Sequence, residues 1–189
     1  RRTASDVAGK SALIMGFGRI GQRVGALCRA LGLRVAAFDP YMERSPVEGV
    51  EMVKDFRAIL PETDFLCLHL PSTPETRDLI GAGELALLKR GAFVLNCARG
   101  GIVDEDVLCD ALESGHLGGA GLDVFAKEPP DTAHRLFRQE KVLLSPHNAA
   151  LTEECAIRMA TQAVQNVLDC LDGKLQPRVV MNRREIGMA

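Results

Sequence analysis

A glycine-rich turn between an apolar strand and an amphipathic helix is the feature that most constrains the fold of this chain. Residues 11–15 (SALIM) are apolar without alternation, which is typical of a strand that is buried on both faces. The turn that follows, GFGRIG at 16–21, has the spacing G-x-G-x-x-G. Apolar residues then recur at helical spacing over 19–31. The sequence therefore predicts a strand, a tight turn and a helix in direct succession.

Five more short apolar runs follow the same plan. They predict strands at 35–38, 65–68, 93–96, 120–123 and 142–145, and the segments between and after them predict helices at 84–89, 105–113 and about 153–172. Strands of this kind with helices between them favour a parallel sheet that is covered on both faces, with right-handed crossovers. We therefore expect an α/β fold, a doubly wound parallel sheet of the Rossmann type, as a single domain over 1–189.

Composition and charge exclude several classes of protein. The chain has 189 residues, a net charge of -2 and 47% hydrophobic residues, which is typical of a globular domain without a nucleic-acid or anionic-membrane partner. No run approaches the roughly 20 apolar residues that span a bilayer. Six cysteines form no C-x-x-C pair and no metal-type spacing with histidine, so we expect no metal site. We expect most of these cysteines to be buried in a protein of the reducing cytoplasm.

The three glycines of the turn have different expected roles in a dinucleotide-binding loop. Gly16 permits the tight turn, Gly18 lets the backbone approach a pyrophosphate, and Gly21 lets helix and strand pack closely. The N-terminus of the helix offers N–H groups and a partial positive charge to the phosphates, and Arg19 adds a full charge. The turn therefore predicts a phosphate-binding cradle.

Asp39 indicates which dinucleotide is bound. It follows the second predicted strand, 18 residues after Gly21 (39 minus 21). A carboxylate at this place can accept hydrogen bonds from both ribose hydroxyls and would repel the 2′-phosphate of NADP, which indicates NAD. Arg44 is near enough in the sequence to bind a 2′-phosphate, so NADP stays open as the alternative.

Polar side chains follow the later predicted strands, where ligands bind to such sheets. Arg99 can pair with a carboxylate in a bidentate geometry, or alternatively form a salt bridge with a neighbouring acid. His147 can carry a proton at physiological pH, or alternatively be a core histidine held by a hydrogen bond. Glu128 can pair with His147 and fix the orientation of its ring, or alternatively be a solvated loop acid. We expect Asp123 at the same edge.

Six sequence blocks occur in a characteristic order: GFGRIG, FDPY, HLPSTPETRDLIG, NCARGGIVDEDVL, GLDVFAKEPP and SPHNAALTEE. Over about residues 8–172 the chain resembles the D-2-hydroxyacid dehydrogenases, and in particular their phosphoglycerate dehydrogenase and hydroxypyruvate reductase branch. The resemblance implies hydride transfer between NAD(H) and a 2-hydroxy or 2-keto acid, such as phosphoglycerate or hydroxypyruvate. It further implies that Arg99 holds the substrate's carboxylate and carbonyl oxygen, that His147 donates the proton in reduction, and that Glu128 pairs with His147.

The same resemblance implies that NAD(H) contacts residues at the ends of several strands. These are Gly16, Gly18, Arg19, Ile20 and Gly21 at the pyrophosphate, Asp39 at the ribose, Leu70 and Pro71 on the adenosine side, Cys97 and Ala98 beside the nicotinamide ribose, Asp123 near the carboxamide, Ala149 and Ala150 near the ring, and Arg99 and His147, which also contact the substrate.

The resemblance also implies what the chain lacks. Members of the family carry a separate substrate domain built from both chain ends, so we expect an NAD-binding fragment that binds NADH without turnover and that forms a homodimer. Two alternatives stay open, namely an NAD-sensing, corepressor-like binding module and a sugar-nucleotide or NADP enzyme on the same fold. The sequence leaves the particular 2-keto acid and the physiological direction of the reaction open.

Overall fold

The computed structural model describes residues 5–183 and 185–187. The chain divides into two compact units, residues 1–147 and residues 148–189, and each unit is described by itself. The first unit holds every predicted strand and all the predicted site residues up to His147. The expectation of a single domain over 1–189 stays a prediction.

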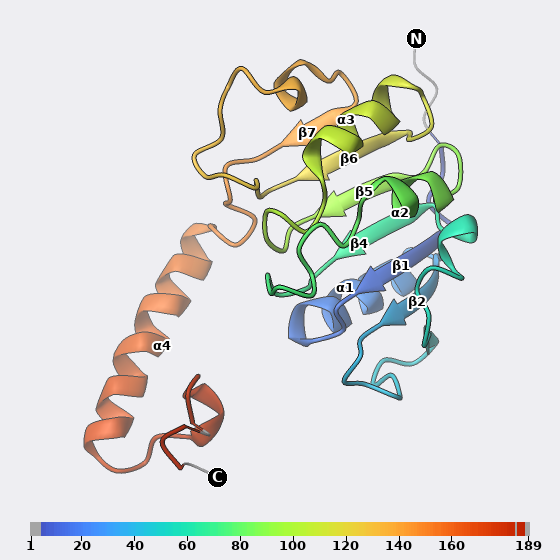
Figure 1. Ribbon diagram of the computed structural model, residues 1–189. Helices are drawn as coiled ribbons and strands as arrows, with labels where there is room; N and C mark the ends of the chain where they lie inside the picture. The colour runs from blue at the N-terminus through green and yellow to red at the C-terminus, as the bar shows by residue number, and fades with distance from the viewer. Residues whose placement is uncertain (1–4, 184, 188–189) are drawn as a thin grey trace. The chain divides into compact units, whose positions relative to one another are not determined.

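The first unit is built on a seven-stranded sheet in which all paired strands are parallel, in the order β3-β2-β1-β4-β5-β6-β7 (Figure 1). The chain winds outward from β1 in one direction and from β4 in the other, which confirms the doubly wound fold. One strand, β3, was not predicted. The strands are β1 Ser11–Met15, β2 Arg34–Phe38, β3 Val50–Met52, β4 Phe65–Leu68, β5 Phe93–Asn96, β6 Gly119–Leu122 and β7 Val142–Leu144.

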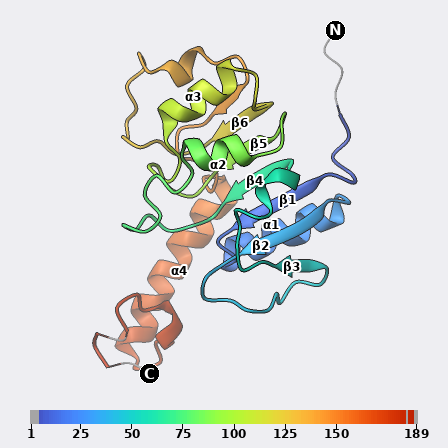
Figure 2. The same cartoon turned by 45° about the vertical axis from the view of Figure 1, so that its right-hand side comes forward.

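Helices lie on both faces of this sheet. Figures 1 and 2 show α1 on one face and α2 and α3 on the other. The helix predicted at 105–113 is confirmed at both ends, whereas α2 begins two residues before its predicted start (84 minus 82). The helices of the first unit are α1 Arg19–Ala30, α2 Ala82–Leu87 and α3 Glu105–Glu113, with short 3-10 helices η1 Leu60–Glu62 and η2 Arg135–Arg138.

Alternate residues of the central strand enter two separate cores. Leu13 and Met15 of β1 belong to a buried cluster that includes Leu85 of α2 and Leu108 of α3. The residues between them, such as Ile14, belong to a second cluster against α1. Because neighbouring residues of a strand point to opposite faces, the apolar run 11–15 supplies both cores at once. This packing fixes the end of β1, where the glycine turn begins.

The outer half of the sheet departs from the prediction of coverage on both faces. Side chains alternate between the two faces of a strand, so Phe93 and Leu95 of β5 and Leu143 of β7 lie on the face of the sheet that carries α1. Phe93 is 40% exposed and Leu143 is 81% exposed. Leu95 of β5 is half-buried against the second core, so the departure is confined to Phe93 and Leu143.

The cysteines also depart from expectation. We expected most of them to be buried, and this was wrong because several lie at strand ends or on helix surfaces rather than in the core. Cys67 and Cys109 are buried, Cys28 and Cys155 are half-buried, and Cys97 and Cys170 are exposed.

The second unit consists of one long helix and a short tail. The helix α4 spans Glu153–Leu171, and Thr152 is its N-cap: the hydroxyl oxygen of Thr152 accepts the N–H of Cys155 at 3.1 Å. A 3-10 helix, η3 Pro177–Val179, follows. Among the described residues of the chain, no helix is long and apolar enough to cross a membrane.

Candidate functional site

The glycine turn is closely packed on one side and open on the other. Gly16 has a φ of 86°, which favours glycine, and a Cβ at this position would overlap the backbone of His69. A Cβ on Gly21 would overlap the carbonyl oxygen of Gly16. Gly18, the N-cap of α1, faces open space with no atom within 4 Å of an added Cβ. The turn therefore leaves room for a ligand at the N-terminus of α1.

The first turn of α1 has the electrostatic character of an anion site. It contains no acidic side chain, and Arg19 and Ile20 are both exposed. Gly18 provides no side-chain cap, so the first N–H groups of the helix are available to an acceptor from outside. These features fit the pyrophosphate of a dinucleotide, as the sequence predicted for Arg19, Ile20 and the glycines.

Asp39 is held directly beside the glycine turn. Its Oδ2 accepts the N–H of Phe17 at 2.9 Å, and its Oδ1 accepts the N–H of Tyr41 at 3.0 Å. Because a carboxylate oxygen can accept more than one hydrogen bond, both oxygens keep capacity for a further donor. The carboxylate therefore has a fixed orientation and can accept the two ribose hydroxyls.

The end of β4 adjoins this turn. The strands β1 and β4 are neighbours at the point where the order of the sheet reverses, the usual place for a ligand in such folds. Leu70 is 7% exposed and Pro71 is exposed. The carbonyl of Pro71 accepts the hydroxyl of Thr76 at 2.7 Å, which ties the loop back on itself. The predicted adenosine-side residues thus lie at the switch point.

A buried amide shapes the loop that carries Arg99. Asn96 is 3% exposed, its Oδ1 accepts the N–H of Ala98 at 3.1 Å, and its Nδ2 donates to the carbonyl of Arg99 at 3.0 Å. The guanidinium of Arg99 is exposed and donates to the carbonyl of Ala98 at 2.6 Å. No acid pairs with Arg99 among the described residues, so the salt-bridge alternative is not seen. Sequence reasoning overlooked Asn96, although a polar residue that ends an apolar strand is itself a signal.

Asp123 and Cys97 lie at the adjoining strand ends. Asp123 is 4% exposed, and its Oδ1 accepts the hydroxyl of Ser145 at 2.6 Å. The N–H of Asp123 donates to the carbonyl of Asn96 at 3.0 Å and so joins the ends of β5 and β6. Although Cys97 as a residue is exposed, partial desolvation of its thiol, together with the nearby carboxylate of Asp123, raises the pKa of that thiol, so the neutral form is favoured.

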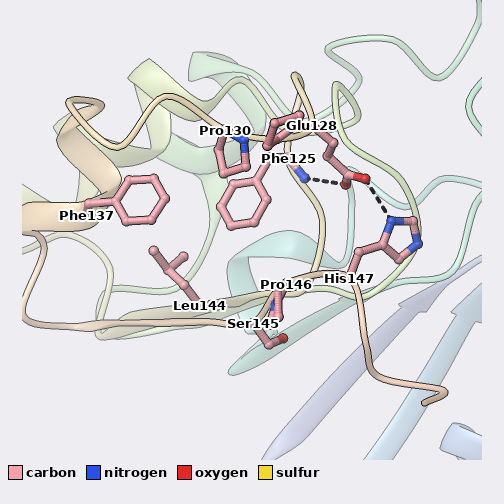
Figure 3. A pocket seen from close by; sticks show the side chains of 9 residues that line it. Phe125, Glu128, Pro130, Phe137, Leu144, Ser145, Pro146 and His147 are labelled. Atoms are coloured by element: carbon pink, nitrogen blue, oxygen red, sulfur yellow. Dashed lines mark hydrogen bonds and ion pairs between the residues drawn. The ribbon is translucent and has the colours of Figure 1, made fainter.

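Glu128 and His147 form a hydrogen-bonded pair. The Nδ1 of His147 lies 2.8 Å from the Oε2 of Glu128, and the Oε1 of Glu128 accepts the N–H of Phe125 at 3.1 Å (Figure 3). These hydrogen bonds, that from His147 foremost, hold the pKa of Glu128 below its ordinary value. An ionised Glu128 accepts a hydrogen bond from Nδ1–H of His147, which leaves Nε2 as the nitrogen that can exchange a proton with a ligand.

The backbone of His147 is unusual. Its φ is 53°, a value that non-glycine residues rarely adopt, and such a conformation costs of order 1–3 kcal/mol. Strained residues of this kind cluster at functional sites. The pairing with Glu128 is one interaction that holds the ring in place.

An apolar cavity of about 330 Å³ lies beside this pair. Figure 3 shows it between the rings of Phe125, Phe137 and Pro130 and the side chain of Leu144, while the imidazole of His147 lies beyond Glu128. The cavity is therefore walled by the same two segments that carry Glu128 and His147, but Nε2 does not point into it.

The structure brings most of the predicted site residues to one edge of the sheet. Each of six parallel strands is followed by a predicted site residue, and parallel strands end at the same edge of the sheet. The pairs are β1 with the glycine turn, β2 with Asp39, β4 with Leu70, β5 with Arg99, β6 with Asp123 and β7 with His147. Ala149 and Ala150 belong to the second unit, and their place near the nicotinamide stays a prediction.

Comparison with known proteins adds an independent finding. Residues 1–149 match the model of the family described as "D-isomer specific 2-hydroxyacid dehydrogenase, NAD binding domain". The chain belongs to this family. The match ends close to the boundary of the first compact unit at His147 and confirms the resemblance read from the sequence.

Curated relatives and solved structures agree with this membership. The chain is 42% identical over 180 residues to the D-3-phosphoglycerate dehydrogenase of Mycobacterium leprae and 39% identical over 177 residues to that of Methanocaldococcus jannaschii, covering 94% and 93% of this chain. It spans 34% of the length of each of these relatives. A D-isomer specific 2-hydroxyacid dehydrogenase from Lactobacillus delbrueckii ssp. bulgaricus, solved in its NAD-complexed form, superposes with a TM-score of 0.85 at 29% identity, over 95% of this chain and 58% of that one.

Proposed function

We propose that the chain binds NAD(H) along the carboxyl edge of its sheet and, in the full-length protein, transfers a hydride between NAD(H) and a 2-hydroxy or 2-keto acid. The observation that carries this proposal is the 2.8 Å contact between His147 and Glu128 at the edge that also holds the glycine turn. A proton carrier and a dinucleotide cradle on one edge are what carbonyl reduction requires.

The residues present fit a bound dinucleotide. The open space at Gly18 admits the pyrophosphate, and the fixed carboxylate of Asp39 favours NAD over NADP. When bound, NADH supplies the hydride that adds to the keto carbon. Leu70 and Pro71 are proposed to line the adenosine side, and Cys97, Ala98 and Asp123 the nicotinamide side.

The chain's own residues supply position and a proton. We assign to Arg99 the orientation of the substrate carboxylate, because its guanidinium is exposed and can form a bidentate pair. His147 gives the proton on Nε2 to the oxygen that becomes negative during reduction, and accepts it in the reverse direction. Glu128 accepts the hydrogen bond from Nδ1 and fixes the orientation of the imidazole.

The substrate class is proposed from the relatives. Phosphoglycerate or hydroxypyruvate is favoured, since the curated relatives reported above are D-3-phosphoglycerate dehydrogenases. Because these relatives are named as dehydrogenases, an enzyme is favoured over the alternative of an NAD-sensing, corepressor-like module. A panel of 2-keto acids with NADH, assayed on the full-length protein, tests the proposal, and absence of NADH oxidation with every acid of the panel would refute it.

We infer a homodimer in the cytoplasm. We also infer that the chain has no nucleic-acid or membrane partner, since a net charge of -2 gives no overall attraction to a polyanion. Light scattering on the purified protein tests the dimer, and a monomer mass at micromolar concentration would exclude it.

A further inference from the structure

A carboxylate outside the proposed site reaches the segment that carries Glu128. Glu105, the first residue of α3, accepts the N–H of Ala126 through its Oε1 at 2.6 Å. Ala126 lies two residues before Glu128 (128 minus 126) and directly after Phe125, whose own N–H is bound by Glu128. The contact therefore joins two segments that are 21 residues apart in the chain.

The N-terminus of α3, which carries Glu105, is held by hydrogen bonds and by a strand-like bridge. Asp104 caps α3 by accepting the N–H groups of Asp106 and Val107, both at 3.1 Å. Just before the cap, Val103 forms a parallel bridge with Ile80, and both residues are buried. A side chain mounted on such an element can hold a loop more precisely than another loop could.

A second contact holds the segment that carries Glu128. A Cβ on Gly100 would overlap the carbonyl of Phe125 and the nitrogen of Ala126, so the backbone next to Arg99 lies directly against the backbone before Glu128. Gly100 therefore packs against the same Phe125–Ala126 peptide group whose N–H is bound by Glu105.

We propose that Glu105 is a positioning residue, which holds Ala126 so that the carboxylate of Glu128 meets both Phe125 and His147. The inference rests on the proposed function for the role of the Glu128–His147 pair in proton transfer. A hydrogen bond from a backbone N–H to an ionised carboxylate is about twice as strong as a neutral one, which suits a fixed tether.

The competing explanation is that Glu105 merely stabilises α3, because acidic residues are favourable in the first turn of a helix. Asp106 provides the matched control. It is acidic and lies in the same turn, but its carboxylate contacts His134 at 3.6 Å instead of the 125–128 segment. Loss of charge in the first turn is therefore common to Glu105→Ala and Asp106→Ala, whereas loss of the tether belongs to Glu105→Ala alone.

The test is carried out by NMR on the 189-residue chain without cofactor. Two readouts are compared among wild type, Glu105→Ala, Glu105→Gln and Asp106→Ala, namely the hydrogen-exchange rate of the Ala126 amide and the titration of the Glu128 carboxyl. In Glu105→Ala we expect exchange to be at least about fivefold faster, since one hydrogen bond is lost. We also expect the pKa of Glu128 to rise towards its ordinary value. Asp106→Ala should resemble wild type, and Glu105→Gln, which keeps an acceptor oxygen but loses the charge, should fall between wild type and Glu105→Ala.

Glu105→Asp provides a second variant should Glu105→Ala fail to fold. It keeps the charge at the helix N-terminus but withdraws the carboxylate by one methylene, so it should behave as Glu105→Ala is expected to. Unchanged exchange at Ala126 overturns the proposal, and so does faster exchange with an unchanged titration of Glu128. Neither readout involves NADH or turnover, so a failure of the proposed function would appear separately, in the binding and activity assays.

Discussion

The carboxylate of Glu128 accepts hydrogen bonds from one backbone N–H and one imidazole, and so connects a loop to the residue proposed to move a proton. Phe125 precedes Glu128 in the segment that follows β6, whereas His147 follows β7. The proposed proton transfer therefore depends on the contact between the loops that follow β6 and β7. Single substitutions in these loops can change the rate of proton transfer without changing the affinity for the cofactor.

Replacing His147 by alanine tests proton transfer. In the full-length protein we expect kcat to fall roughly 10²–10⁴-fold, the usual contribution of a general acid, with the NADH dissociation constant nearly unchanged. Steady-state kinetics and a fluorescence titration with NADH measure the two quantities. A kcat within a few-fold of wild type would remove His147 from this role.

Replacing Asp39 by alanine tests cofactor choice. We expect weaker NADH binding and a narrower gap between NADH and NADPH, because the carboxylate that would repel a 2′-phosphate is gone. Asp55→Ala is the matched control, since Asp55 accepts the N–H of Arg57 two residues on, much as Asp39 accepts that of Tyr41. Equal selectivity in both variants and wild type would mean that Asp39 does not contact the ribose.

The lowered pKa of Glu128 predicts how its contribution to stability depends on pH. A carboxyl whose pKa is lower in the folded state stabilises the fold above its unfolded pKa, and that stabilisation is lost as the pH falls through the folded pKa. Wild type should therefore melt above Glu128→Gln at neutral pH, and the two Tm values should converge as the pH is lowered below the ordinary range of a glutamate. A constant difference in Tm across this range would contradict the assignment.

At the scale of the elements, the glycine turn is set by how closely β1 and α1 approach each other. Gly21→Ala places a methyl group against the carbonyl of Gly16, so we expect destabilisation of roughly 1–3 kcal/mol together with a loss of NADH affinity. Gly83→Ala is the control, since it lies within α2 with open space around it and should stabilise the chain by about 0.5–1 kcal/mol. Denaturant unfolding and NADH titration of both variants measure these effects, and equal stability of the two variants would contradict the close packing.

The sequence predicted the elements well where local signals were strong. The helix α3 was predicted at its observed bounds from its helical pattern, and the structure adds that Asp104 caps its N-terminus. The strand β3 was not predicted, because the alternation Val50, Glu51, Met52 is only three residues long and is too short to indicate a strand. It forms by pairing with β2, an interaction with a distant segment.

The sequence also predicted some parts of the candidate site and missed others. Glycine spacing and the polar residues after each strand indicated the edge at which Arg99, Asp123 and His147 meet. The hydrogen bonds of Asn96 and Glu105 could not be read from the sequence in the same manner. Glu105 acts across 21 residues, and only the folded backbone brings it to Ala126.

At the scale of the whole molecule, the chain spans about a third of the length of its curated relatives and carries the sheet edge that is proposed to bind the dinucleotide. We expect this chain to bind NADH and to show no turnover, because residues that complete the substrate site are expected in a separate domain. Calorimetry and a keto-acid assay on the same preparation measure both. Turnover by the chain at a rate near that of the full-length protein would contradict the expected need for a second domain.

One edge of this sheet is proposed to bind a dinucleotide, and an NADH titration of the isotopically labelled chain, followed by NMR, tests this proposal. We expect the resonances that shift to belong to the glycine turn, Asp39, the loop at Arg99 and the segment at His147. Absence of shifts at millimolar NADH, or shifts confined to the opposite edge of the sheet, would contradict it.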